Sequence, residues 1–255
     1  MIANYHTHTP RCNHAQGTER EYALEAQKAG LKILGFSDHS PQLFPDGYRS
    51  GIRMEPEQVE DYARQVRLVR AEFAGMLEVH LGVEMEYYPA LFSDTVAMLR
   101  DAGVEYLLLG QHFLGNEMGE AYAGTPTEDV TILDRYCRQV MDGMQTGRFT
   151  YLAHPDLIRY QGDEGIYRDR MRRLCREARS CGVPLEWNLL GQATGRHYPN
   201  LRFWELAAEE GCACILGRDA HDPKAFRDKD TETHALTLLR SLNLPPLETL
   251  PLRPL

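Results

Sequence analysis

The sequence has no long apolar run. No apolar stretch follows the first residues, as it would in a secretory signal, and none further along is long enough to cross a bilayer. We therefore expect a cytoplasmic protein without a targeting segment and without a membrane as partner.

Positive charge is also in short supply. The 255 residues include 28 Lys and Arg against 37 Asp and Glu, which gives a formal net charge of -9 at pH 7. Because nucleic acids and anionic membranes attract basic surfaces, this balance argues against both as partners. It leaves room for a positive site confined to one cavity.

Two common kinds of binding motif are missing. The six cysteines are scattered without the CxxC spacing of zinc ribbons and redox motifs, so we expect them to be reduced and mostly buried. The glycine fingerprint GxGxxG is absent, and so is GxxxxGK followed by Ser or Thr. Their absence weakens the case for the open-sheet nucleotide-binding folds.

The sequence does contain a regular alternation of short apolar runs and helical patterns. Strands are predicted at 1–6, 31–39, 77–87, 105–112, 149–154, 183–190 and 212–221. Helices are predicted at 18–30, 56–75, 93–101, 127–147, 164–181, 199–210 and 231–242, the first with a capping box at Thr18 and the fourth capped by Thr127. The tail after residue 242 is expected to pack in an extended form.

Seven βα units in series predict a parallel sheet that is covered on both faces. Such a sheet can close into a (β/α)7 barrel or stay open and doubly wound. With 43% hydrophobic and 25% charged residues, the chain 1–255 is expected to form a single domain around one core.

Polar side chains collect at the carboxyl ends of the predicted strands. They are His6 and His8, Asp38 and His39, Glu84 and Glu86, His112, His154, Glu186 and Asn188, and Asp219 and His221. In a βα barrel these ends share one rim, where barrel enzymes carry out their chemistry. Alternate residues of a strand project to the same side, so His6 and His8 can converge on the barrel axis, as can Asp219 and His221.

This collection of imidazoles and carboxylates favours a metal site. Unpaired polar groups that are buried together are costly, whereas divalent ions would neutralise and order them. A lone histidine is more often a surface residue or a hydrogen-bonded core residue. That explanation does not account for candidate metal ligands at the same level of six strands out of seven, all except the sixth.

The motifs HTH, SDH, GVE, QHF, AHPD and RDAH occur in this order between Tyr5 and Pro223. On these motifs the sequence resembles the PHP (polymerase and histidinol phosphatase) family, and most of all its histidinol-phosphate phosphatase branch. The resemblance implies a distorted (β/α)7 barrel that holds three divalent metal ions, usually zinc, manganese or iron, with a hydroxide between two of them.

The resemblance also implies roles for nine residues. A first metal would be held by His6, His8, Glu84 and Asp219, a second by Glu84 as a bridge with His112 and His154, and a third by His14, His39 and His221. Glu84, Asp219 and His221 would be the catalytic residues. Either Asp219 or His221 would pass a proton to the leaving oxygen.

A small phosphorylated substrate suits such a site. Three divalent ions, two carboxylates and one hydroxide leave a formal charge of about +3, which would trap an anion. Arg159 and Arg196 follow strand ends, and a guanidinium group matches phosphate in geometry and charge. The resemblance favours L-histidinol phosphate, an intermediate of histidine biosynthesis, with Glu86, Tyr160 and the acidic or aromatic side chains of residues 42–54 as candidates to receive its alcohol part.

Three alternatives stay open. One is another phosphoesterase of this family, acting on a nucleotide, a sugar phosphate or a phosphopeptide, which would share the metals and differ in the loops. The stretch EWNLLG leaves this possibility open, because it departs from the small, hydroxyl-rich sequence expected after the Asn of the sixth strand in the histidinol-phosphate phosphatase branch. An amidohydrolase-type barrel would have eight strands and a bridging Lys or carboxylate on the fourth, where this sequence has His112. A structural or regulatory metal domain would lack ligands, yet all nine positions are filled.

Overall fold

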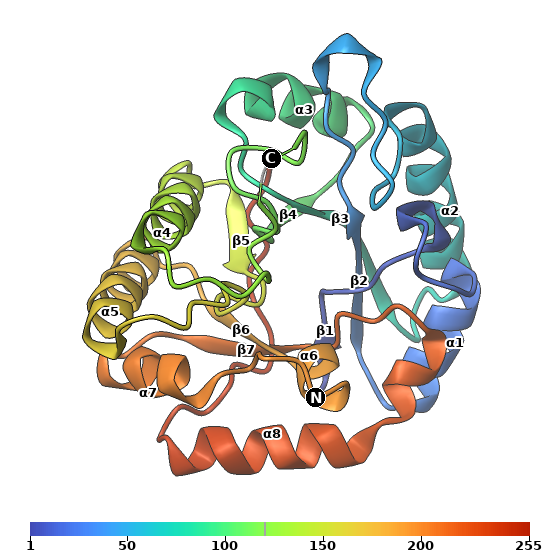
Figure 1. Ribbon diagram of the computed structural model, residues 1–255. Coiled ribbons are helices and arrows are strands. Elements are labelled where there is room, and N and C mark those ends of the chain that lie inside the picture. The colour runs from blue at the N-terminus through green and yellow to red at the C-terminus, as the bar shows by residue number, and fades with distance from the viewer. Residues whose placement is uncertain (120) are drawn as a thin grey trace.

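The protein is a barrel of seven parallel strands surrounded by helices (Figure 1). The computed structural model describes residues 1–119 and 121–255. The strands are β1 (Ala3–Asn4), β2 (Ile33–His39), β3 (Glu78–Met85), β4 (Tyr106–Leu109), β5 (Phe149–Leu152), β6 (Leu185–Asn188) and β7 (Cys214–Gly217). Each strand pairs in parallel with the next one in the sequence, which confirms the predicted (β/α)7 barrel. The consecutive order excludes a doubly wound sheet, whose strand order reverses at a switch point.

The barrel closes beyond the ends of its first and last strands. β1 is only two residues long, and the closing contacts lie in the segments that follow β1 and β7. The backbone N–H of His8 donates to the carbonyl oxygen of Ala220 at 2.9 Å, and that of Ala220 donates to the carbonyl of His6 at 3.2 Å. These two hydrogen bonds join the segments that carry four of the predicted metal ligands.

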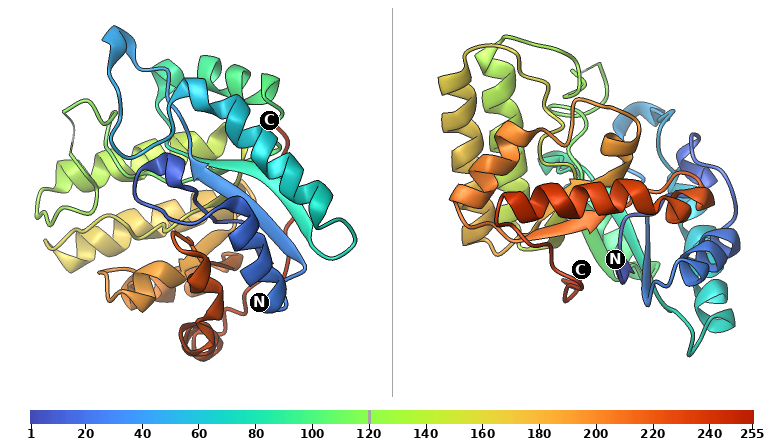
Figure 2. Two further views of the ribbon diagram at one scale, coloured as in Figure 1. Left: turned by 90° about the vertical axis from the view of Figure 1, so that its right-hand side faces the viewer. Right: turned by 90° about the horizontal axis from the view of Figure 1, so that it is seen from below.

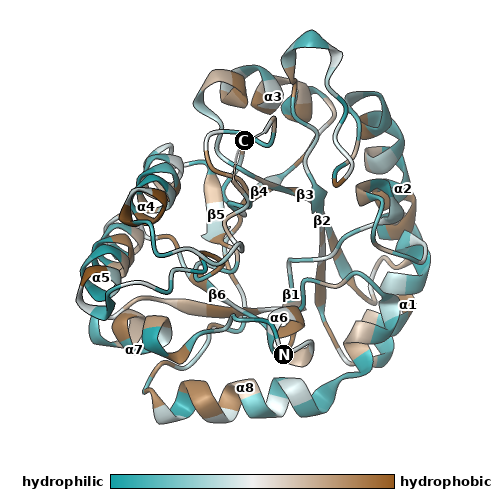
Figure 3. Cartoon of the chain, viewed as in Figure 1, coloured by the Kyte–Doolittle hydropathy of each residue, from teal (hydrophilic) through white to brown (hydrophobic). Residues whose placement is uncertain are grey.

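Helices cover the outside of the barrel, as the two side views show (Figure 2). They are α1 (Glu19–Lys28), α2 (Val59–Glu72), α3 (Pro89–Asp101), α4 (Val130–Gln145), α5 (Glu164–Ser180), α7 (Leu201–Glu209) and α8 (Lys229–Ser241), whereas the short helix α6 (Leu189–Ala193) lies at the rim (Figure 1). The outer helices carry both hydrophilic and hydrophobic residues (Figure 3). In α4 the buried positions Leu133, Tyr136, Val140 and Met144 follow helical spacing, so one face packs on the sheet. Among the described residues, no helix is both long and apolar enough to cross a membrane.

The structure confirms one predicted helix cap and corrects another. The Thr18 hydroxyl accepts a hydrogen bond from the backbone N–H of Glu21, and the Glu21 carboxylate accepts one from that of Thr18, as a capping box requires. The predicted cap of the fourth helix, Thr127, is wrong, because Asp129 caps α4. Thr127 instead pairs its backbone with the segment after β5, where its N–H donates to the carbonyl of Arg159 at 3.0 Å.

Other helices also differ from the prediction. α3 begins at Pro89 instead of residue 93, since proline suits the first turn of a helix. The short helix α6 was not predicted. It follows β6 directly because the Asn188 side chain accepts a hydrogen bond from the backbone N–H of Gly191 at 2.8 Å. The cap therefore lies on a residue that also faces the rim.

Tyrosines fill the barrel below the rim. The Tyr106 ring lies over Gly82, where an added Cβ would come within 2.3 Å of the ring, so glycine leaves room for it. Its hydroxyl donates to the carbonyls of Tyr5 and Phe36 at 2.7 and 3.0 Å. The extended C-terminal tail crosses behind the barrel (Figure 1), and Leu250 donates its backbone N–H to the hydroxyl of Tyr5 at 3.1 Å. The barrel is therefore packed and closed at this end, which leaves the opposite rim for ligands.

Candidate metal centre

All nine residues predicted as metal ligands lie together at the carboxyl ends of the strands. His39 and Glu84 are within β2 and β3, and the others follow strand ends: His6, His8, His14, His112, His154, Asp219 and His221. Ring contacts with centroid separations of 4.0 to 5.0 Å join all seven imidazoles into one cluster. Glu84 and Asp219 lie among them.

The first predicted set surrounds one point. Nε2 of His6 is 3.4 Å from Glu84 Oε2 and 3.5 Å from Asp219 Oδ1. Nε2 of His8 is 3.6 Å and 3.1 Å from the same two atoms. Two ligand atoms held about 2.0–2.2 Å from one tetrahedral ion lie roughly 3.3–3.6 Å apart. The separations therefore fit four ligands of a common ion.

The second predicted set lies on the other oxygen of Glu84. Glu84 Oε1 is 2.8 Å from Nε2 of His154 and 3.6 Å from Nε2 of His112. One carboxylate thus contacts both sets, with one oxygen toward each. This is the arrangement that a bridging carboxylate needs.

The third predicted set is nearer to solvent. Ligand atoms of His14, His39 and His221 lie within 4.8 Å of one another. The turn Pro10–Cys12 and the left-handed backbone of Asn13, at φ 68°, bring His14 back over the cluster. Its Nδ1 is 2.7 Å from the carbonyl oxygen of Cys12, so Nδ1 carries the proton and Nε2 is free to bind an ion.

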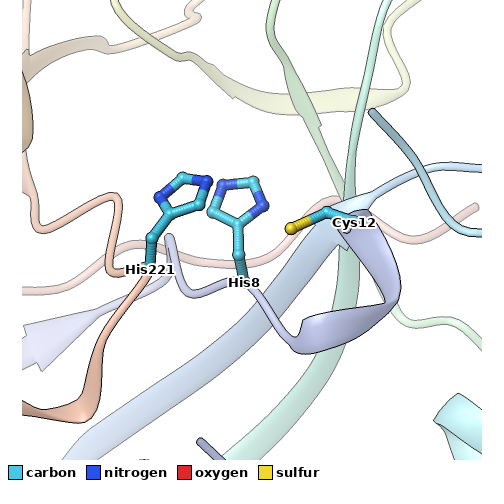
Figure 4. Close-up of side chains that lie close together, drawn as sticks. All are labelled: His8, Cys12 and His221. Atoms are coloured by element: carbon cyan, nitrogen blue, oxygen red, sulfur yellow. The ribbon is translucent and has the colours of Figure 1, made fainter. Parts of the chain in front are cut away.

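Cys12 lies beside this third set. Figure 4 shows the His8 ring between His221 and Cys12, with one ring nitrogen facing the sulfur. Burial alone would raise the pKa of the Cys12 thiol, but its contacts with His14 and His8 outweigh burial and lower that pKa. As predicted, the six cysteines are free, and five of them are buried.

A second layer of carboxylates orients the histidines. Glu186 Oε1 accepts a hydrogen bond from Nδ1 of His6 at 2.8 Å, and Glu86 Oε1 is 2.9 Å from Nδ1 of His112. Each contact directs the Nε2 atom at the cluster, as second-layer partners do in metal sites. Asn188 donates from its side-chain nitrogen to Glu186 Oε2 at 3.0 Å and to Asp219 Oδ2 at 3.1 Å.

Sequence reasoning placed Glu86 and Glu186 at the rim but missed these roles. The signal was present for Glu86, which follows Glu84 by two residues in the predicted strand 77–87 and so is expected to face the same side, although β3 itself ends at Met85. Glu86 was a candidate to receive the substrate, and the structure corrects this. Both of its oxygens are engaged, by Arg53 and by His112. Tyr160, which was also a candidate, is buried and stacks on Tyr167.

The electrostatics suit bound cations. Burial would raise the pKa of Glu84 and of Asp219, but the surrounding imidazoles lower both pKa values well below the ordinary range. Burial and the neighbouring His8 lower the pKa of His221 to about 3, so that its ring is neutral. Two ionised carboxylates among imidazoles form a donor set that suits zinc, manganese or iron.

Several buried donor atoms of the cluster have no hydrogen-bond partner. They include Nε2 of His6, Nε2 of His8, Oε2 of Glu84 and Nε2 of His221. Buried polar atoms without partners are rare and costly, so they mark positions where a ligand would be expected. The residues present therefore fit divalent ions.

Two glycines make room for the carboxylates. A Cβ on Gly110, after β4, would lie 1.9 Å from Glu84 Oε1. A Cβ on Gly217, at the end of β7, would lie 1.7 Å from Glu186 Oε1. Any side chain at either position would displace the carboxylate beside it. Neither glycine was identified from the sequence, because this requirement comes from a neighbouring strand.

The backbone is strained at two ligands. His154 has φ 31° and Asp219 has φ 49°, in the left-handed region that non-glycine residues rarely occupy. Such strain persists only where the surrounding structure enforces it and is often found at functional sites. Here it turns the two side chains that follow β5 and β7 toward the cluster.

A cavity of about 430 Å³ opens above the cluster. It is lined by His14, His39, Ile52, Glu84, His112, Phe113, Tyr122, His154, Leu190, Arg196, Tyr198, Asp219 and His221. Its volume suits a small molecule. Arg196 is thus at the cavity, where its Nη1 donates to the Tyr198 hydroxyl at 2.6 Å, whereas Arg159 is not among the described lining residues.

Comparison with known proteins gives one family. A model of the PHP domain matches residues 4–189. A probable histidinol-phosphatase of Deinococcus radiodurans is 33% identical over 231 residues, which cover 87% of this chain and 87% of that protein. The histidinol-phosphatase of Bacillus subtilis is 31% identical over 118 residues, or 43% of each chain.

Solved structures share the fold. The histidinol phosphate phosphatase of Lactococcus lactis, complexed with zinc, L-histidinol and phosphate, has a TM-score of 0.75 at 20% identity and covers 98% of this chain and 96% of that one. A putative histidinol phosphatase of Listeria monocytogenes has a TM-score of 0.72 at 17% identity, with 90% and 99% covered.

Proposed function

The chain belongs to the PHP domain family, and on that premise we propose that it hydrolyses L-histidinol phosphate to L-histidinol and inorganic phosphate with the help of divalent metal ions. The observation that carries the proposal is the cluster in which Glu84 contacts two groups of imidazoles at the bottom of one cavity. The relatives named as histidinol-phosphatases support the choice of substrate.

We assign three metal positions to the chain's own residues. His6, His8, Glu84 and Asp219 hold the first, Glu84 with His112 and His154 the second, and His14, His39 and His221 the third. When bound, the ions would supply positive charge for the phosphoryl oxygens and would lower the pKa of a water between two of them toward about 7, so that it attacks as hydroxide. The protein's part is to hold the donors in place and to keep the carboxylates ionised.

Arg196 binds the phosphate in this proposal. It is an exposed residue at the cavity, with its guanidinium group 5.8 Å from the centre of the Tyr198 ring. A guanidinium can donate two parallel hydrogen bonds to phosphate oxygens. Arg159 keeps the second phosphate role only if it turns toward the cavity when substrate is bound.

We expect Arg196→Ala to lower kcat/KM at least about tenfold, because a charge-assisted hydrogen bond to the phosphate is lost. Phosphate release and metal content would be measured together, and the metals should be retained. The same measurements on Arg159→Ala give the comparison, because Arg159 is not among the described residues that line the cavity. Unchanged kinetics in Arg196→Ala would remove this residue from the phosphate site.

Protonation of the leaving oxygen is assigned to Asp219 or His221. Both line the cavity, and His221 Nδ1 is 3.0 Å from the carbonyl oxygen of Asp219. Either side chain would take up the proton that the attacking water loses and pass it to the alcohol oxygen as that oxygen leaves. Such proton transfer speeds the loss of a poor leaving group.

The runner-up is a phosphatase of the same family that acts on another small phosphomonoester or on a nucleotide. Part of the cavity lining, made by Ile52, Phe113 and Tyr122, is apolar and aromatic. It would accept the imidazole of histidinol, and it would also accept other planar groups.

The free and mostly buried cysteines fit the cytoplasm, where we place the reaction.

The test is elemental analysis of the purified protein, followed by phosphate release from L-histidinol phosphate and from a panel of nucleotides and sugar phosphates. Three divalent ions per chain, and a kcat/KM highest for L-histidinol phosphate, are expected. A higher kcat/KM for another monoester would favour the runner-up. Bound metal without hydrolysis of any phosphoester would indicate a structural or regulatory domain instead.

A further inference from the structure

A buried arginine joins two loops beside the metal centre. Arg53 belongs to the loop between β2 and α2, and its side chain is 1% exposed. Its Nη1 and Nη2 donate to the two oxygens of Glu86 at 2.8 and 2.9 Å. Its Nε donates to Glu117, on the loop between β4 and α4, at 2.8 Å. One guanidinium therefore binds Glu86, directly after the end of β3, and a second loop at once.

Glu86 connects this arginine to a proposed metal ligand. Its Oε1 accepts from Arg53 and also lies 2.9 Å from Nδ1 of His112. The contact keeps the proton on Nδ1 and turns Nε2 toward Glu84, which is 3.6 Å away. With both of its oxygens held by Arg53, Glu86 has a single position from which to orient the ring.

The same arginine also fixes one wall of the cavity. Ile52, its neighbour in sequence, lines the cavity, and so do Phe113 and Tyr122 on either side of Glu117. A third contact, from Nη1 of Arg53 to the carbonyl oxygen of Ser40 at 3.1 Å, holds the start of the loop next to His39. Arg53 thus contacts both loops that carry these lining residues and also the carboxylate beside His112.

We propose that Arg53 is a positioning residue for His112, acting through Glu86, and that its contact with Glu117 couples the aromatic wall of the cavity to the second metal position. The inference rests on the proposed function for its effect on turnover. Its effect on metal binding can be measured without any substrate.

A purely structural role is the alternative. A buried ion pair is weak evidence for stability, because desolvation of its charges offsets much of their attraction. Loss of one partner would also leave uncompensated charge and could unfold the chain. The test therefore uses variants that keep the charge or the shape.

The experiment compares wild type with Arg53→Lys, Glu86→Gln and the double variant. Circular dichroism is used first to verify that each variant is folded. Lysine keeps the charge but cannot hold both Glu86 oxygens with a planar fork. Arg49→Lys is the matched control, since Arg49 pairs with Glu55 and Glu57 on the exposed side of the same loop. Zinc per chain is measured after dialysis against a series of chelator concentrations, and kcat and KM are measured with L-histidinol phosphate.

We expect Arg53→Lys to release one of the zinc ions about 10- to 100-fold more readily and to lower kcat by a similar factor, as loss of a second-layer partner does. The double variant should retain zinc as well as Glu86→Gln does, because the effects of two residues that act through the same contact are not additive. Unchanged zinc retention in Arg53→Lys, or additive effects in the double variant, would overturn the proposal. If no variant, wild type included, hydrolyses L-histidinol phosphate while the zinc results hold, the proposed substrate fails and the positioning role stands.

Discussion

At the scale of single residues, the metal centre depends on the small size of neighbouring glycines as much as on its ligand atoms. Glu84 can contact both imidazole groups because Gly110, directly after the next strand, has no Cβ. His6 and His112 each direct one nitrogen at the cluster because a buried carboxylate takes the other. Donor type and local space together define the site.

Gly110→Ala tests this at one atom. The added Cβ would lie 1.9 Å from Glu84 Oε1, so the carboxylate must move away from His112 and His154. We expect at least about a tenfold loss of activity, together with fewer bound metals per chain by elemental analysis. Gly51→Ala is the control, because no atom lies within 4 Å of its added Cβ. A Gly110→Ala protein with the metal content of wild type would contradict the bridging role of Glu84.

At the scale of elements, each helix and strand is tied to its neighbours away from the rim as well. Near the floor of the barrel, Glu105 precedes β4 and accepts a hydrogen bond from the backbone N–H of Leu81 in β3 at 2.9 Å. It also pairs with Arg70 of α2 at 2.6 Å. One carboxylate thus joins two strands and a helix.

This contact predicts a defined dependence of stability on pH. Burial would raise the pKa of Glu105, but His80, the Leu81 N–H and Arg70 outweigh burial and lower it to about 2. The folded pKa is below the unfolded one, so the stabilisation is present above about pH 4.5 and is lost as pH falls toward about 2. Glu105→Gln should lower the free energy of unfolding by about 1–2 kcal/mol at pH 7, measured by urea denaturation.

The difference between Glu105→Gln and wild type should shrink as the pH falls below 4.5. Glu78→Gln serves as a control, since that carboxylate is 63% exposed and pairs with His80. A difference that stays constant between pH 7 and pH 3 would show that Glu105 stabilises through packing and not through its charge.

At the scale of the whole molecule, the rim closes the barrel. The segments after β1 and β7 meet through the backbone of His8 and Ala220, and both carry ligands of the first proposed metal. Bound ions would therefore hold together the two ends of the sheet. Without them the clustered imidazoles keep unpaired buried nitrogens, which is costly.

Removal of the metals should accordingly lower the melting temperature. A ligand present at a thousand times its dissociation constant stabilises the folded state by about 4 kcal/mol. Dialysis against a chelator should shift the thermal transition followed by circular dichroism to lower temperature, and added zinc or manganese should restore it. Identical melting of the treated and untreated protein would speak against ions that tie the barrel together.

Most of the candidate site could be predicted from the sequence, and the reason is geometric. Parallel strands bring all their carboxyl ends to one rim, so residues far apart in sequence, such as His8 and His154, could be grouped without coordinates. The periodicity of the strands predicted which side chains share a face. Helix limits were less certain, because caps such as Asp129 and Asn188 are chosen by local hydrogen bonds that depend on neighbouring segments.

The sequence by itself determined the order of βα units and the kinds of donor at each strand end, since both follow from local periodicity and residue chemistry. Only the tertiary structure decided that Arg53 and Glu117 meet, that Gly110 makes room for Glu84, and that Glu86 serves His112 instead of a substrate. These contacts join segments whose separation in the chain carries no periodic signal. They arise from packing between loops and strands, which depends on the whole fold at once.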